Sequence, residues 1–166
     1  PTKPVLLAEP GKIRQYSIYN ALEVIEKDGG SEEDIVIIHD AARPLLSQEL
    51  ITKCYQECEV ADGVLPVTAV KDTVYYSNDG KQIESLLDRS KLWAGQAPEA
   101  FLFKKYLQAH RKIKREELLK INGSTELAFK AGLNCHLVAG DPMNFKITTP
   151  EDLGAFEEII KTKRND

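Results

Sequence analysis

The sequence predicts an α/β domain in which helices cover a largely parallel β-sheet and a β-hairpin is inserted between the strands. Two observations predict this class. Short apolar runs alternate along the 166 residues with stretches whose apolar residues recur at helical spacing. Residues 72–93 interrupt this alternation with two strand-like runs that flank Asn78, Asp79 and Gly80, a combination typical of a hairpin turn. We expect this hairpin to project from the sheet.

Three strands and two helices are predicted before the hairpin. Residues 5–8 predict a short strand, and residues 18–25 carry apolar side chains at helical spacing. The β-branched run at residues 35–39 predicts a strand that is buried on both faces. A second helix is expected after Ser47, and residues 63–67 predict the strand that follows it.

The part of the chain after the hairpin predicts three more helices. The first covers residues 102–113, and Ser124 is expected to cap a second, shorter one. Residues 135–138 predict a strand, and Lys146 is expected on another short strand. Thr149, followed by a proline and two acidic residues, predicts the start of the last helix. We expect that helix to be buried through Leu153, Phe156, Ile159 and Ile160.

Composition narrows the classes of function. Hydrophobic residues make up 42% and charged residues 29% of the chain, which suits one globular domain over residues 1–166. The net charge of −4 argues against a general nucleic-acid binder, and no apolar run is long enough to span a membrane. Cys54, Cys58 and Cys135 show no paired spacing, which predicts reduced thiols and a cytoplasmic location. We interpret Cys54 and Cys58 as packing residues rather than half of a metal site.

Three polar clusters could carry chemistry. Asp40 and Arg43 directly follow the predicted strand at residues 35–39, where α/β sheets bind ligands. Asp40 fits a metal ligand and an ion pair that fixes the turn equally well. Arg89 lies at the far end of the hairpin and Lys146 near the last helix, and each alone fits a solvent-exposed residue. Together a carboxylate, an arginine and a lysine suit phosphoryl transfer, although the sequence holds no glycine-rich phosphate-binding motif.

Several segments, in the same order along the chain, resemble the 2-C-methyl-D-erythritol 4-phosphate cytidylyltransferase family. The chain reads His-Asp-Ala-Ala-Arg-Pro at residues 39–44, like the family's signature. Residues 11–17 resemble its glycine-x-x-arginine-x-x-serine element. The remaining matches are the entry to its β-arm at 70–73, the exit from that arm at 87–93 and 96–101, and its terminal motif at 144–153. The resemblance implies a Rossmann-like, three-layer nucleotidyltransferase sheet with an inserted β-hairpin arm at about residues 70–93 and with its N-terminal part missing.

The resemblance also implies a reaction and its nucleotide side. A sugar-alcohol phosphate attacks the α-phosphate of CTP, with Mg²⁺ present, and pyrophosphate leaves. Gly11 and Ser17 would contact the cytosine and the ribose, and Ala41 would let the substrate approach the turn closely. Asp40 would serve the metal and the acceptor, and Asp141 could assist the metal.

Four further residues would serve the acceptor or the reacting phosphates. Arg43 would fix the signature turn or contact the acceptor, and Ser124 lies where the family places an acceptor-binding threonine. Arg89 would grip the acceptor's phosphate, in this family usually from the arm of a partner subunit. Lys146 would lie near the reacting phosphates. The resemblance thus implies a homodimer held together by the β-arm.

Two departures from the family fall on the acceptor side. Ala97, Pro98 and Glu99 stand where the family usually has threonine, proline and glutamine, and Thr125 replaces its usual aspartate. Ribitol 5-phosphate is therefore an alternative acceptor. An alternative of another class is a non-catalytic dimerising module. Because the family's N-terminal glycine-rich nucleotide loop is absent from these residues, we expect the chain to be a fragment that binds CTP weakly and turns over little by itself.

Overall fold

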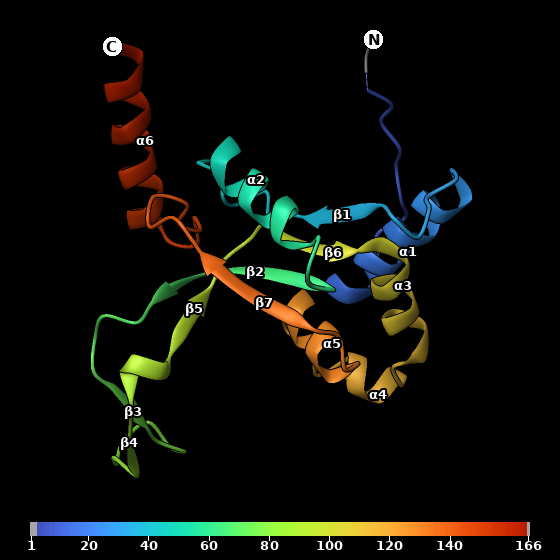
Figure 1. Ribbon diagram of the computed structural model, residues 1–166. Helices are drawn as coiled ribbons and strands as arrows, with labels where there is room; N and C mark the ends of the chain where they lie inside the picture. The colour runs from blue at the N-terminus through green and yellow to red at the C-terminus, as the bar shows by residue number, and fades with distance from the viewer. Residues whose placement is uncertain (1–2, 166) are drawn as a thin grey trace.

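The computed structural model describes the backbone of residues 3–165 and the side chains up to residue 162. A five-stranded sheet forms its centre (Figure 1). The strands are β1 (Ile35–Ile38), β2 (Gly63–Ala69), β5 (Trp93–Gly95), β6 (Glu99–Leu102) and β7 (Cys135–Ala139). The helices are α1 (Arg14–Lys27), α2 (Gln48–Glu57), α3 (Phe103–Lys112), α4 (Arg115–Leu118), α5 (Ser124–Lys130) and α6 (Pro150–Asn165).

Strand β2 is the centre of this sheet. One edge of β2 pairs first with β6 and then with β5, both antiparallel, and the other edge pairs parallel with β7. Among the described strands, β1 pairs with β6 alone, in the register Val36 opposite Phe101. The prediction of a largely parallel sheet is therefore wrong in its pairing. Strands β1, β2 and β7 do run in one direction, but β6 returns from the hairpin and inserts between β1 and β2 with the opposite direction.

Helices cover both faces of the sheet and give it three layers (Figure 1). Helices α1, α3 and α5 surround a core that contains Leu22, Phe101 and Tyr106. Helix α2 packs on the opposite face, where Cys54 and Cys58 are buried against β2 and β6. Cys54 and Cys58 are 0% and 2% exposed within that core, as expected for packing residues.

Local sequence signals predicted several helix ends correctly. The Ser47 Oγ accepts the backbone N–H of Leu50 at 3.2 Å and so caps α2. The Thr149 Oγ1 accepts the N–H of Asp152 at 3.2 Å at the start of α6. Each bond satisfies one of the donors that the first turn of a helix leaves free.

Other local predictions are wrong. Residues 5–8 form no strand, and Val5 and Leu7 are 86% and 90% exposed, because no strand lies beside them in the described part of the chain. Strand β1 is not buried on both faces, since Ile37 lies at the edge of the sheet and is 37% exposed. Helix α6 stands away from the sheet in Figure 1, so Leu153 is 46% exposed rather than buried.

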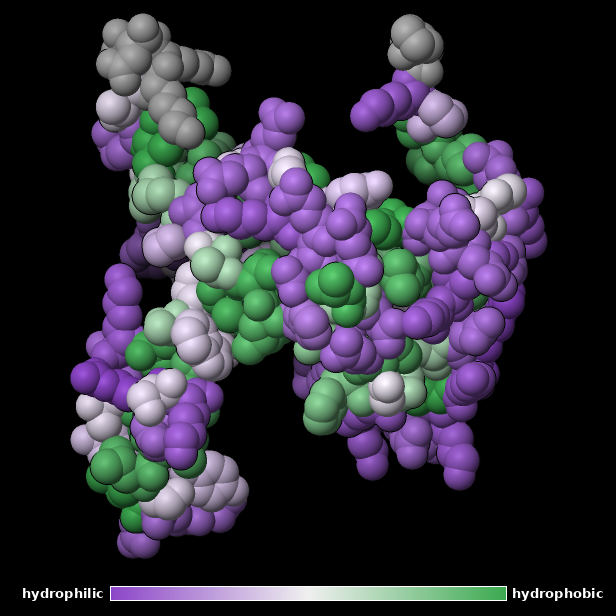
Figure 2. Space-filling model, viewed as in Figure 1, coloured by the Kyte–Doolittle hydropathy of each residue, from purple (hydrophilic) through white to green (hydrophobic). Residues whose placement is uncertain are grey.

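The predicted hairpin is present and projects from the sheet (Figure 1). It pairs β3 (Val74–Tyr76) with β4 (Ser85–Leu87) as a separate two-stranded sheet. Gly80 adopts φ +70° in its connection, a conformation that favours glycine. Figure 2 shows apolar residues on the surface of this arm, where Ile83 and Leu86 are 69% and 64% exposed. Within the described residues, no helix has the length and apolar character that crossing a membrane requires.

Candidate active site at the end of strand β1

The chain leaves β1 through a turn that presents Asp40. The Arg43 N–H donates to the Asp40 carbonyl oxygen at 2.9 Å. His39 Nε2 donates to the Arg43 carbonyl oxygen, also at 2.9 Å. These bonds close residues 39–44 into a compact turn, called here the 39–44 turn. Ala41 lies exposed on it beside Asp40.

Three cationic side chains surround the Asp40 carboxylate. Lys146 Nζ lies 3.2 Å from Oδ2, Arg14 Nη2 lies 3.4 Å from Oδ1, and Arg43 Nε lies 3.7 Å from Oδ2. Burial raises the pKa of Asp40, but the hydrogen bond and charge of Lys146, with the charges of Arg14 and Arg43, bring that pKa below its usual value. The carboxylate therefore stays ionised at neutral pH.

Lys146 reaches this cluster from a loop and not from a strand. Its segment is extended, but the structure gives it one backbone bond to the site, from the Ile147 N–H to the Ala42 carbonyl oxygen at 2.8 Å. The prediction of a short strand is therefore wrong, because one backbone bond ties the segment to the 39–44 turn without forming a strand ladder. Asp40 and Lys146 lie far apart in the sequence and nevertheless meet there, as the sequence predicted.

Arg14 is the site residue that sequence reasoning missed. It lies in the first turn of α1, and its Nη1 donates to the Ser124 Oγ at 2.7 Å. Its Nη2 lies 3.4 Å from the carboxylates of both Asp40 and Glu99. The glycine-x-x-arginine-x-x-serine element contained the signal, because Arg14 is its arginine, but only the glycine and serine of that element were interpreted as site residues.

Glu99 and Thr125 were noted only as departures from the family, and the structure brings them together. Glu99 lies on β6 and is 6% exposed. Its Oε2 accepts the backbone N–H of Thr125 at 2.6 Å and the Thr125 Oγ1 hydroxyl at 2.7 Å. The two departures therefore form one contact beside Arg14.

Ser124 does not cap α5. Gly123 occupies the cap position, and Ser124 is the first residue of the helix. The Ser124 side chain is fully buried and accepts from Arg14 instead. The sequence signal for a cap was misread because the arginine that occupies this hydroxyl lies 110 residues earlier in the chain.

Gly11 and Ser17 form a second, smaller arrangement at the start of α1. The Gly11 N–H donates to the Ser17 Oγ at 2.9 Å. A Cβ on Gly11 would clash with Cβ of Tyr16 and would lie 2.6 Å from the Ser17 nitrogen. Only glycine therefore fits this approach of the loop to the helix.

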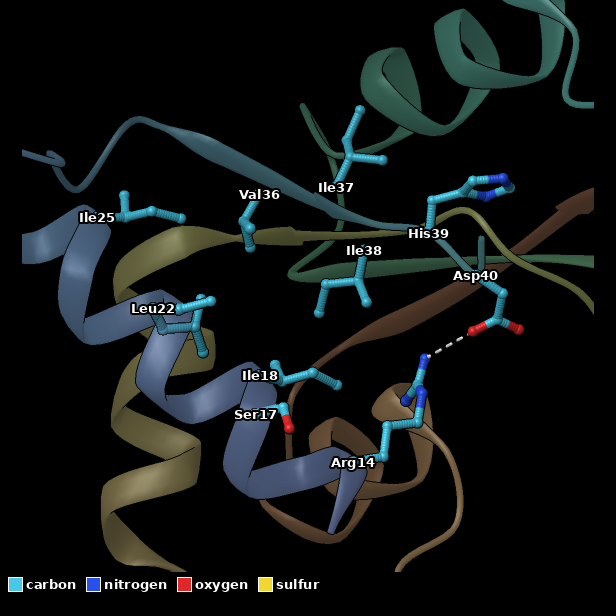
Figure 3. A pocket seen from close by; sticks show the side chains of 11 residues that line it. Arg14, Ser17, Ile18, Leu22, Ile25, Val36, Ile37, Ile38, His39 and Asp40 are labelled. Atoms are coloured by element: carbon cyan, nitrogen blue, oxygen red, sulfur yellow. Dashed lines mark hydrogen bonds and ion pairs between the residues drawn. The ribbon is translucent and has the colours of Figure 1, made fainter. Parts of the chain in front are cut away.

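Two cavities meet at Arg14 and Asp40. The first, about 370 Å³, lies between α1 and β1 and is lined by apolar side chains such as Ile18, Leu22 and Val36 (Figure 3). We call it the apolar cavity. The second, about 280 Å³, is the polar cavity, whose lining includes Arg14, Asp40, Arg43, Gln96, Glu99 and Lys146. Ser17 lines the apolar cavity close to the junction (Figure 3).

Arg89 and Asp141 line neither cavity. Arg89 lies in the short 3₁₀ turn Arg89–Lys91 near the base of the arm, where its Nη1 donates to the Lys71 carbonyl oxygen at 2.6 Å. The Asp141 Oδ1 accepts the Met143 N–H at 2.8 Å. Among residues 3–162, whose side chains the structure describes, no three His, Cys, Asp or Glu side chains gather closely enough to hold a metal by themselves.

Known proteins share this sequence and fold. A family model described as "IspD: 2-C-methyl-D-erythritol 4-phosphate cytidylyltransferase" matches residues 1–162. The chain is 37% identical over 159 residues to the 2-C-methyl-D-erythritol 4-phosphate cytidylyltransferase of Caldanaerobacter subterraneus subsp. tengcongensis, covering 96% of this chain and 68% of that protein. It is 34% identical to the protein of the same name from Acaryochloris marina, covering 97% of this chain and 66% of that protein.

Solved structures of proteins with the same name share the fold of this chain. The crystal structure of 2-C-methyl-D-erythritol 4-phosphate cytidylyltransferase from Thermus thermophilus superposes with a TM-score of 0.78 at 28% identity, covering 92% of this chain and 72% of the other. The enzyme from Francisella tularensis gives 0.79 at 27% identity, covering 89% and 68%. The chain thus spans about two thirds of the length of the relatives it matches.

Proposed function

The chain belongs to the 2-C-methyl-D-erythritol 4-phosphate cytidylyltransferase family, and we propose on this premise that it transfers CMP from CTP to 2-C-methyl-D-erythritol 4-phosphate. The observation that carries the proposal is the junction of an apolar and a polar cavity at Arg14 and Asp40. A transfer between two substrates needs two subsites that share one reacting point. The relatives favour this acceptor over ribitol 5-phosphate, and favour an enzyme over a non-catalytic module.

The apolar cavity suits the nucleoside part of CTP. Its walls of α1 and β1 offer apolar side chains to a flat base, and Ser17 supplies a hydroxyl at the end nearest Asp40. Gly11 supports this position, because its N–H holds the Ser17 Oγ. CTP bound in this way would direct its phosphates toward Lys146.

The polar cavity suits an anionic polyol. Arg14, Arg43 and Lys146 line it together with three carboxylates, Asp40, Glu99 and Glu126, of which Glu126 is paired with Lys130 at 2.8 Å. The Arg43 Nε makes no hydrogen bond within the described residues. These cations could hold the phosphate group of the acceptor, and the polar groups of the lining could form hydrogen bonds with its hydroxyls.

The reaction is an in-line displacement at the α-phosphorus of CTP. An ionised phosphate oxygen of the acceptor forms the new bond to phosphorus, and the bond between that phosphorus and the bridging oxygen of the β-phosphate breaks. Pyrophosphate leaves with the electron pair, so no proton transfer is required. Lys146 and Arg14 would stabilise the negative charge that spreads over the phosphoryl oxygens.

The residues present fit Mg²⁺ through Asp40. One accessible carboxylate is available there, and Mg²⁺ is commonly bound by one or two carboxylates together with substrate phosphates and water. The ion would neutralise phosphate charge and polarise the α-phosphoryl group. Asp141 would need to join from outside the polar cavity, so Asp40 is the ligand we propose.

We also propose a homodimer in the cytoplasm. Exposed apolar residues on the arm, including Ile83 and Leu86, suit a subunit contact. Arg89 near the arm's base donates to the Lys71 carbonyl oxygen and lines neither cavity of its own chain, which suits a role in the site of the partner subunit. The unpaired thiols support a reducing compartment.

The test is pyrophosphate release by the intact protein that contains these residues, with CTP and Mg²⁺. We expect release with 2-C-methyl-D-erythritol 4-phosphate and much less with ribitol 5-phosphate. Release with ribitol 5-phosphate alone would assign the other acceptor, and no release with either would contradict the proposed activity.

Mixing two inactive variants tests the shared site. Asp40→Asn and Arg89→Ala homodimers should each be nearly inactive. After exchange of subunits, hybrid dimers would contain one site with both native residues, and about a quarter of the wild-type activity should return at equal mixing, by the symmetry of a two-fold dimer. An unchanged low activity after confirmed exchange would place Arg89 outside the partner's site.

A further inference from the structure

We propose that Glu99 is a positioning residue, which holds the Arg14 guanidinium and the first turn of α5 in place around the polar cavity. The inference rests on the proposed function, since it states what this arrangement does for acceptor binding. Glu99 lines the polar cavity and bonds to Arg14 and Thr125, so it would act through these two residues rather than on the chemistry itself.

The burial of Glu99 requires an explanation. A carboxylate that is 6% exposed loses most of its hydration, and this cost is offset only where the oxygens find good partners. Oε2 accepts both donors of Thr125, at 2.6 Å and 2.7 Å. Oε1 faces Arg14. The carboxylate therefore connects β6, the start of α5 and the start of α1.

The Arg14 guanidinium lies between the carboxylates of Asp40 and Glu99. Its Nη2 lies 3.4 Å from an oxygen of Asp40 and 3.4 Å from an oxygen of Glu99, so neither ion pair is tight. Its Nη1 is fixed more closely, at 2.7 Å from the Ser124 Oγ. Without the charge of Glu99, attraction toward Asp40 would be unopposed. We expect Arg14 then to move onto Asp40 and away from the position in which it would meet the acceptor.

Two substitutions separate the two contacts of Glu99. Glu99→Gln restores the family's usual residue here but not the aspartate that the family usually has in place of Thr125, so this site loses its charge. The amide oxygen can still accept from Thr125, but the amide N–H₂ would face the donors of Arg14 without attraction. This variant keeps the tie to α5 and loses the hold on Arg14. Thr125→Val weakens the tie to α5, because it removes the hydroxyl but leaves the bond from the backbone N–H, and it keeps the carboxylate that faces Arg14.

The experiment is a double-mutant cycle in the intact enzyme, with Glu99→Gln, Arg14→Met and both together. We expect Glu99→Gln to raise the KM for the acceptor about tenfold and to change the KM for CTP less than about twofold, as loss of one charged positioning contact would. On the Arg14→Met background it should add less than about twofold, because its target is gone. Glu57→Gln, remote from both cavities, is the matched control.

Three results would overturn the inference. These are an unchanged acceptor KM in Glu99→Gln, an equal rise in the KM for CTP, or a full additional loss on the Arg14→Met background. A crystal structure of Glu99→Gln gives a readout without activity. The Arg14 Nη2 to Asp40 Oδ1 distance should fall below 3.4 Å, and an unmoved guanidinium contradicts the inference. If the wild-type enzyme transfers no CMP, the proposed function fails, while this distance still decides the role of Glu99.

Discussion

At the scale of single residues, Asp40 shows how burial and charge compete. Burial alone would raise its pKa, and Lys146, Arg14 and Arg43 together reverse that effect. Because the folded pKa lies below the unfolded one, this carboxylate contributes stability above the unfolded pKa, and the contribution is lost as the pH falls through the folded pKa.

Replacing Lys146 with methionine should raise the pKa of Asp40. The substitution removes the hydrogen bond and charge that most lower this pKa, while burial still raises it. Titration of the Asp40 carboxyl by ¹³C NMR measures the change. Lys53→Met, which removes a separate pair with Glu49 on α2, should leave Asp40 unaffected. An Asp40 that titrates at the same pH in both variants would contradict this account.

His110 predicts a second effect of pH. It is 5% exposed, stacks with Tyr19, meets Tyr106 edge to face, and has no hydrogen-bond partner for either ring nitrogen within the described residues. Burial lowers its pKa from 6.5 to about 4. As the pH falls below 6.5 the unfolded chain binds this proton first, so the free energy of unfolding falls toward pH 4.

His110→Leu should remove that part of the pH dependence. We expect the loss of unfolding free energy between pH 7 and pH 5 to shrink by about 2 kcal/mol, from the size of the shift. Urea unfolding at the two pH values measures it, with His136→Leu, at a side chain 37% exposed, as the control. Equal losses in wild type and His110→Leu would mean that His110 is not the group responsible.

Residue types predicted part of this site. Asp40, Arg43 and Lys146 were found because they follow a strand end or a recognisable motif, and the structure brings them together. Arg14, Glu99 and Thr125 escaped because their contacts join α1, β6 and α5. Spacing along the chain carries no signal for contacts between segments that are 26 to 110 residues apart.

At the scale of elements, the start of α1 depends on Gly11. The loop passes so close to the helix that a side chain would meet Tyr16 and the backbone of Ser17. Helix α1 also carries Arg14 in its first turn. Displacing the loop would therefore disturb both the Ser17 contact and the junction of the cavities.

Gly11→Ala should lower the free energy of unfolding by about 1–3 kcal/mol, as overpacking of a tight contact usually does. Gly154→Ala is the matched control, because nothing lies within 4 Å of a Cβ there and the residue is inside α6. That change should instead raise helix stability by about 0.5–1 kcal/mol. Chemical unfolding followed by circular dichroism compares them, and equal effects of the two substitutions would refute the packing argument.

Elements with strong local signals were predicted well, and those set by distant partners were not. Neighbouring residues alone determine three of these features: the strand at 35–38, the cap at Ser47 and the turn of the arm. Strand β6 does not, since its place between β1 and β2 comes from pairing with residues far away in the sequence, such as Gly63 opposite Phe101. For the same reason residues 5–8, with strand-like composition but no neighbouring strand, stay outside the sheet.

At the scale of the whole molecule, the arm is the part that makes few contacts with the rest. Its two short strands pair only with each other, and its apolar side chains face outward. A two-stranded hairpin is marginally stable alone, so such an arm suits docking on a partner.

If the arm holds the proposed homodimer together, replacing residues 73–87 with a short Gly/Ser linker should give a monomer. Light scattering coupled to size-exclusion chromatography measures the mass, and circular dichroism should show that the central sheet is intact. Leu50 and Val64 belong to a core that the arm does not contact, so folding should survive. A mass unchanged by the deletion would assign the subunit contact to another surface.

The position of β2 has a consequence for how the molecule opens. Three strands depend on β2 directly, and β1 is attached only through β6. Backbone amides of β2 should therefore be released to deuterium exchange only when the whole sheet separates, whereas those of β1 need only the loss of one neighbour. Asp40 directly follows β1, so this carboxylate would be carried by the strand that detaches first. Substrate bound across α1 and β1 would then protect the amides of β1 from exchange.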